Sequence, residues 1–73
     1  MVRYNSFMNI SINKEMISLP EKTTITELLE KLDIERKYIA VEINMAIIPK
    51  SEFDQYQLKE NDRVEIIRAV GGG

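Results

Sequence analysis

One short amphipathic helix among extended segments constrains the fold of this chain more than any other feature. Thr24, followed three residues later by Glu27, is typical of a capping box, in which a hydroxyl and a carboxylate satisfy free backbone amides. The apolar residues that follow repeat at helical spacing and predict one stripe: Ile25, Leu28, Leu29 and Leu32. A lone helix with one apolar stripe must bury it, so we expect the helix to cover one face of a sheet.

Short extended segments lie on both sides of this helix. Residues 8–12 alternate between apolar and polar side chains, and residues 16–19 form a second apolar run that Pro20 ends. The intervening turn, residues 13–15, contains no glycine, and the two runs together predict an N-terminal hairpin. After the helix we expect strands at residues 38–43, 46–48 and 63–70.

The segment before the last predicted strand has no sustained period. We expect residues 51–58 to form a loop or a single helical turn, held in place by Phe53, Tyr56 and Leu58. Residues 59–62 form a polar turn, in which Asn61 can adopt positive φ at modest cost.

The order of elements predicts an α+β fold of the β-grasp (ubiquitin-like) type. We expect a mixed sheet of four to five strands with one main helix on one face, because a helical crossover makes a later strand parallel to an earlier one. At 73 residues the chain is one domain. We assign the β-grasp domain to residues 8–70, a flexible glycine tail to residues 71–73, and an N-terminal extension to residues 1–7, whose origin the sequence leaves open.

Composition argues against an enzyme. The chain has no cysteine and no histidine, which removes disulfides, thiolate nucleophiles and the commonest general base and metal ligand. We therefore expect no catalytic residue, no metal site and no bound cofactor. The net charge is −2 without a basic run, and no apolar stretch approaches the roughly 20 residues of a membrane span. We expect a cytoplasmic monomer that binds neither nucleic acid nor membrane.

The three glycines of the chain are all at its end, Gly71, Gly72 and Gly73. Taken alone, they could be a frayed end. After a β-grasp domain, a thread without Cβ atoms indicates a terminus that enters a narrow channel in another protein. The C-terminal carboxylate is then the reactive group, which ATP can activate as an acyl-adenylate.

From residue 8 to residue 73 the chain resembles the ThiS family, the ubiquitin-like sulfur carriers of thiamine biosynthesis. The resemblance rests on these segments: MNISIN (8–13), TITELL (24–29), VEIN (41–44), IPKSEF (48–53), NDRVEII (61–67) and RAVGGG (68–73). Two turn positions differ from the family, which often has glycine at the positions of Met45 and Asn61.

The resemblance implies a cycle of modification at Gly73. A ThiF-like (E1-like) enzyme, using ATP and magnesium, would adenylate this residue, and cysteine-derived sulfur would convert it to a thiocarboxylate. A ThiG-like thiazole synthase would then take the sulfur. Gly71 and Gly72 would thread into the partner enzymes.

Partner docking is a further expectation at the end of the last strand. If Val64 and Ile66 face the helix, Ile67 is partly exposed beside the tail. Ile67, Arg68 and Val70 are therefore the candidate docking residues, with Arg68 and Lys50 able to attract an acidic partner.

Other functions remain open at this level. A sulfur carrier for molybdopterin synthesis or tRNA thiolation would share the fold and the tail. A protein modifier would use the same activated tail to join lysines, and a non-covalent interaction module would not need the tail.

Overall fold

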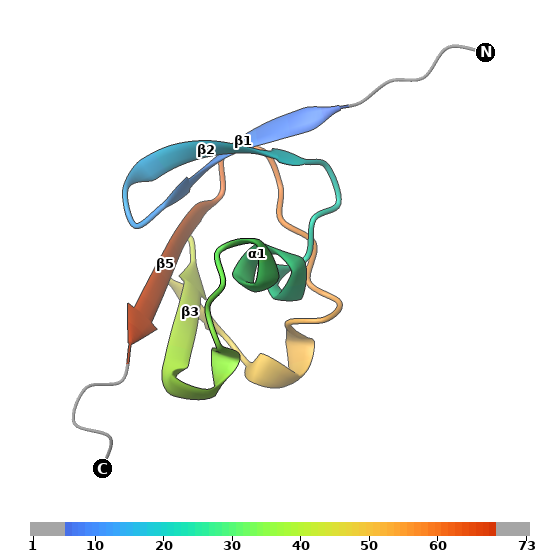
Figure 1. Cartoon of the computed structure of the whole chain (residues 1–73). Helices are drawn as coiled ribbons and strands as arrows, with labels where there is room; N and C mark the ends of the chain where they lie inside the picture. The colour runs from blue at the N-terminus through green and yellow to red at the C-terminus, as the bar shows by residue number, and fades with distance from the viewer. Residues whose placement is uncertain (1–5, 69–73) are drawn as a thin grey trace.

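The computed structural model describes residues 6–68, which form a five-stranded sheet with one α-helix packed on one face (Figure 1). This architecture confirms the predicted β-grasp fold. The elements in chain order are β1 (Phe7–Ile12), β2 (Glu15–Pro20), α1 (Ile25–Lys31), β3 (Ile39–Ile43), β4 (Ala46–Ile48) and β5 (Arg63–Arg68). Two 3-10 turns, Arg36–Tyr38 and Lys50–Glu52, precede β3 and follow β4.

The last strand lies in the centre of the sheet, whose order is β2-β1-β5-β3-β4. β5 is parallel to β1 and antiparallel to β3, while β1–β2 and β3–β4 are antiparallel hairpins, so the sheet is mixed as predicted. The β1–β5 ladder is short, and Asn13 extends it past the end of β1. Ile66 N donates to Asn13 Oδ1 at 2.8 Å, and Asn13 N donates to Val64 O at 2.8 Å.

The core lies between α1 and the helix-facing side of the sheet. Its buried side chains are Met8, Ile10, Ile12, Leu19, Ile25, Leu28, Leu29, Ile39, Val41, Ile43, Phe53, Leu58 and Val64. Phe53 and Leu58 are buried and Tyr56 packs against the cluster, which confirms their predicted role in holding the segment after β4.

The N-terminus of α1 confirms the predicted capping box. Glu27 N donates to Thr24 Oγ1 at 3.1 Å, and Thr24 N donates to Glu27 Oε1 at 2.9 Å. The prediction that the fourth residue of the stripe is buried was wrong, because Leu32 is 37% exposed. The helix ends at Lys31 and Leu32 is its C-cap, so Leu32 lies past the last helical residue, where the core covers it only in part.

Several strand boundaries differ from the prediction. Phe7, which we assigned to the extension, begins β1 and pairs with Pro20. Tyr38 was expected in β3 but belongs to a 3-10 turn and is 55% exposed. The strand predicted at residues 63–70 is observed as far as Arg68, and residues 69 and 70 lie outside the described residues.

Left-handed backbone positions in this fold carry side chains, because the three glycines are all at residues 71–73. Positive φ occurs at Asn13, Lys14, Lys22, Asp33, Asn44, Met45 and Asn61. Asparagine and aspartate tolerate this region because their short side chains bond locally, and the value of 68° at Asn61 confirms its predicted conformation. Met45, with φ of 74° and an 84% exposed side chain, has no such compensation.

We predict that Met45→Gly stabilises the domain. Asn44 and Met45 join β3 to β4 as a two-residue turn with both φ values positive, and the left-handed region costs a residue with a Cβ roughly 1–2 kcal/mol. Part of this gain is offset by the greater entropy of unfolded glycine, so the expected net rise in unfolding free energy is about 1 kcal/mol. Urea unfolding measures it. Met45→Ala, which keeps the Cβ, is the control, and equal stability of the two variants would contradict the explanation.

A polar cluster joins α1 to the first 3-10 turn and to the turn that follows the second one. Arg36 Nη2 lies 2.9 Å from Asp54 Oδ1 and 3.1 Å from Thr26 Oγ1, while the Thr26 hydroxyl donates to the same carboxylate oxygen. The hydrogen bond from Thr26, followed by the hydrogen bond and positive charge of Arg36, lowers the pKa of Asp54 below 3.8. Because this pKa is lower in the folded state, the stabilisation is present above about pH 4 and is lost as the pH falls through the lowered value.

Asp54→Asn is therefore expected to reduce stability slightly at neutral pH and to reduce it less near pH 2. The effect is small because the Asp54 side chain is 70% exposed. Urea midpoints of both proteins at the two pH values measure it, with Glu30→Gln as the control for loss of an exposed carboxylate. An equal deficit of Asp54→Asn at both pH values would contradict the pH linkage.

Candidate functional site

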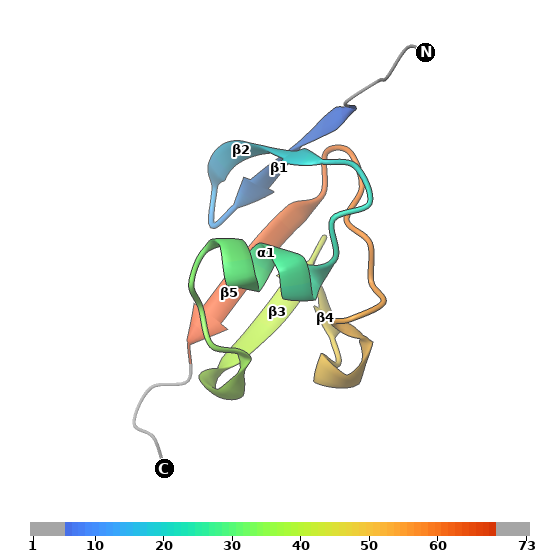
Figure 2. The ribbon, with the colours of Figure 1, turned by 45° about the vertical axis from the view of Figure 1, so that its right-hand side comes forward.

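The end of β5 is the candidate functional site, because the chain passes from this strand to the glycine residues. β1 pairs with the start of β5, whereas β3 pairs with β5 as far as Arg68, so the end of β5 is held by β3. Figure 2 shows β5 crossing beneath α1 and ending beyond the edge of the helix. The predicted site residues Val70, Gly71, Gly72 and Gly73 lie outside the described residues.

The two described candidate docking residues lie on opposite faces of the sheet. Val64 is buried and Ile66 is half-buried against the core, whereas Ile67 is 45% exposed on the outer face, as the alternation predicted. Arg68 is on the helix side. It lines a groove of about 340 Å³ together with apolar side chains from the hairpin, the region after α1 and β5: Ile12, Ile17, Leu32, Ile34 and Ile66.

The second candidate cation, Lys50, serves the fold. Its Nζ donates to Lys37 O at 2.9 Å and thereby links the 3-10 turn after β4 to the turn before β3. The two cations proposed to attract a partner therefore differ, because Arg68 is the last residue of β5 and lines a groove, whereas Lys50 is engaged in a tertiary hydrogen bond.

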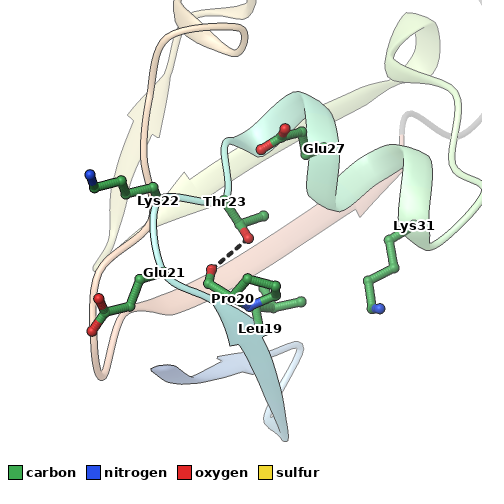
Figure 3. A pocket seen from close by; sticks show the side chains of 7 residues that line it. All are labelled: Leu19, Pro20, Glu21, Lys22, Thr23, Glu27 and Lys31. Carbon is green, nitrogen blue, oxygen red and sulfur yellow. Dashed lines mark hydrogen bonds between the residues drawn. The ribbon is translucent and has the colours of Figure 1, made fainter. Parts of the chain in front are cut away.

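A second candidate site is a pocket of about 510 Å³ between the end of β2 and the start of α1 (Figure 3). Its polar groups already serve the fold. The Thr23 hydroxyl donates to Pro20 O at 2.6 Å, and Glu27 belongs to the capping box. Because β2 is antiparallel to β1 and β1 is parallel to β5, this pocket lies at the opposite end of the sheet from the end of β5.

The most buried carboxylate, Asp62, also has a structural role. It is 7% exposed, and its two oxygens accept hydrogen bonds from Asn44 Nδ2 at 3.0 Å and from Lys59 N at 2.8 Å. Asn44 Oδ1 in turn accepts from Arg63 N at 2.9 Å, so this network joins the β3–β4 turn to the start of β5. Burial raises the pKa of nearby Tyr56, and the charges of Asp62 and Glu52 raise it further.

Within residues 6–68 no group of three His, Cys, Asp or Glu side chains is arranged to hold a metal ion. Of the helices described, none is long and apolar enough to cross a membrane.

Fold and site together define a small β-grasp protein whose central strand precedes the three glycines in the sequence. The ThiS family model matches residues 2–73, and the chain belongs to the ThiS family. It is also similar to a crystal structure of the thiamine biosynthesis protein ThiS from Geobacter metallireducens, with a TM-score of 0.78 and 32% identity. That alignment covers 90% of this chain and all of the other.

Two relatives have names that state a role. The sulfur carrier protein ThiS of Escherichia coli is 29% identical over 66 residues, which are 90% of this chain and 100% of the relative. A thiazole synthase of Paramagnetospirillum magneticum is 35% identical over 66 residues, and there the chain spans only 20% of the relative's length. The resemblance noted from the sequence is thus confirmed, and the family is that of a sulfur carrier rather than a catalyst.

Proposed function

We propose that this protein carries sulfur as a thiocarboxylate at Gly73 and delivers it for thiazole formation. Membership of the ThiS family carries the proposal. Three glycines that follow the central strand support it, since a thread without Cβ atoms can lie close to the backbone of another protein or to a nucleotide.

The proposed chemistry has three steps, and the partner enzymes catalyse them. The Gly73 carboxylate attacks the α-phosphorus of magnesium-bound ATP and releases pyrophosphate, which leaves an acyl-adenylate. Cysteine-derived sulfur, delivered as a persulfide, then displaces AMP to give an acyl disulfide, and a thiol reductant cleaves its S–S bond to release the thiocarboxylate. Finally thiazole synthase takes the sulfur, and the terminus returns as a carboxylate whose new oxygen comes from the acceptor or water.

Catalysis by the partner enzymes, and not by the carrier, fits the composition of the chain. Without histidine or cysteine it has no ready general base or thiolate, and its most buried carboxylate is already held in a structural network. We therefore propose an E1-like adenylating enzyme and thiazole synthase as partners, with ATP and magnesium bound by the first of these and not by the carrier.

Intact-mass spectrometry tests the proposal. The protein is incubated with ATP, magnesium, the E1-like enzyme of the same organism and a cysteine-derived sulfur source. The expected result is a mass gain equal to replacement of one oxygen by sulfur, which requires ATP and reverses on addition of thiazole synthase and its substrates. No mass gain with an enzyme that is active on another carrier would contradict the proposal for that enzyme. A tail joined to lysines of other proteins would favour a protein modifier.

A further inference from the structure

The face of the sheet opposite α1 carries exposed apolar side chains that the core does not use. Ile47 of β4 is 68% exposed and Ile67 of β5 is 45% exposed. Both lie next to residues of β3 on this face, because Ile67 of β5 is paired with Ala40 and Ile47 of β4 is paired with Glu42. We call the surface formed by Ala40, Glu42, Ile47, Glu65 and Ile67 the outer patch.

Two carboxylates occupy the centre of the outer patch. Glu42 of β3 and Glu65 of β5 are direct cross-strand partners, and both are half-buried. Directly opposed side chains on a sheet have Cβ atoms roughly 4.5–5.5 Å apart, and like charges in such pairs destabilise the sheet. The fold therefore gains nothing from placing both glutamates here.

The described part of the domain does not pair the negative charges of Glu42 and Glu65 with cations. Among residues 6–68 the one ion pair is Arg36–Asp54, so neither glutamate has a cation within 4 Å in the described part of the chain. Lys14 and Arg63 line one hollow together with the two glutamates, and both cations lie on the side of the pair away from Ile67. The half of the patch nearer the end of β5 thus combines negative charge with exposed isoleucine.

The outer patch is also close to the proposed reactive end. Ile67 is one residue from the end of β5, and the five residues 69–73 span at most about 18 Å when fully extended. An enzyme that receives Gly73 must therefore approach the end of β5, where the outer patch is within its reach.

We propose that the outer patch docks on thiazole synthase, at a surface where an arginine or lysine lies among apolar side chains. The cation would enter between Glu42 and Glu65 and relieve their repulsion, while Ile47 and Ile67 would be covered by apolar groups. The occurrence of a similar region within the thiazole synthase of Paramagnetospirillum magneticum favours this partner. This inference rests on the proposed sulfur-carrier function.

The double variant Glu42→Gln with Glu65→Gln tests the charge. Its matched control is Glu30→Gln with Glu35→Gln, which removes the same charge from exposed positions outside the outer patch. Binding of each unmodified carrier to purified thiazole synthase of the same organism is measured by calorimetry at low and high salt. We expect the patch variant to bind on the order of tenfold more weakly, with a flatter salt dependence, and the control to bind like the wild type.

Two further readouts separate docking from folding. Ile47→Ser should weaken binding, whereas Met16→Ser, at a 65% exposed position on β2 at the other edge of the sheet, should not. The glutamine double variant should unfold at the same temperature as the wild type or higher, because it removes a like-charge pair. Lost binding with lost stability would overturn the inference, as would equal affinities of the two glutamine double variants.

Failure of the docking inference can be told apart from failure of the proposed sulfur-carrier function. If the intact-mass assay yields the thiocarboxylate but the wild type does not bind thiazole synthase through these residues, the docking inference fails and the carrier function stands. If binding depends on the glutamates but no thiocarboxylate forms, the carrier function fails and the docking surface stands.

Discussion

Phe53→Ala is expected to remove roughly half of the unfolding free energy of the domain. Phe53 is fully buried and is the largest buried side chain, and its carbonyl accepts a hydrogen bond from Thr26 N at 3.2 Å. Replacing a buried phenylalanine with alanine costs about 3–5 kcal/mol. At roughly 0.05–0.15 kcal/mol per residue, a 73-residue domain has only about 4–11 kcal/mol in total.

Thermal unfolding followed by circular dichroism measures this loss. At about 4–8 °C per kcal/mol for a domain of this size, the midpoint should fall by at least about 12 °C. Met16→Ala is the matched control, because it truncates a large apolar side chain that is 65% exposed, and it should change stability by less than about 0.5 kcal/mol. A midpoint for Phe53→Ala within a few degrees of the control would mean that the segment after β4 is not part of the cooperative core.

The local features of this fold could be predicted because neighbouring residues determine them. The capping box needs only Thr24 and Glu27, and the alternation in β1 and β5 needs only the period of two. This is why the exposure of Ile67 followed correctly from the burial of Val64. The burial of Leu32 was predicted wrongly because the helical period predicts which face of a helix is buried but not the residue at which the helix ends.

Features that depend on strand register could not be predicted from the sequence. Glu42 and Glu65 are 23 positions apart, and their opposition follows from the alignment of β3 with β5. Similarly, the sequence suggests a polar turn at Asn13, but its side chain continues the sheet beside Ile66, a contact between residues 53 positions apart. The candidate site at the end of the last strand therefore stays a prediction from the sequence, whereas the opposition of Glu42 and Glu65 became visible only with the strand register.

Deletion of Gly73 is expected to abolish formation of the thiocarboxylate while the domain remains folded. The new terminal carboxylate, on Gly72, would be about 3.3–3.6 Å short of the position that the adenylating enzyme requires. Misplacement of a reacting group by 1 Å can already cost on the order of 100-fold in rate, so we expect no mass gain in the time that fully converts the wild type. The thermal midpoint should not change, since the core residues extend only from Met8 to Val64.

Gly73→Ala separates the position of the carboxylate from the space around it. This variant keeps the terminal carboxylate at the original distance and adds one methyl group, which should slow the reaction because the channel is expected to admit a chain without Cβ atoms. Partial activity of Gly73→Ala with none in the deletion would indicate that position matters most, and loss in both would indicate that space matters as well. Conversion of the deletion variant at the wild-type rate would contradict Gly73 as the modified residue.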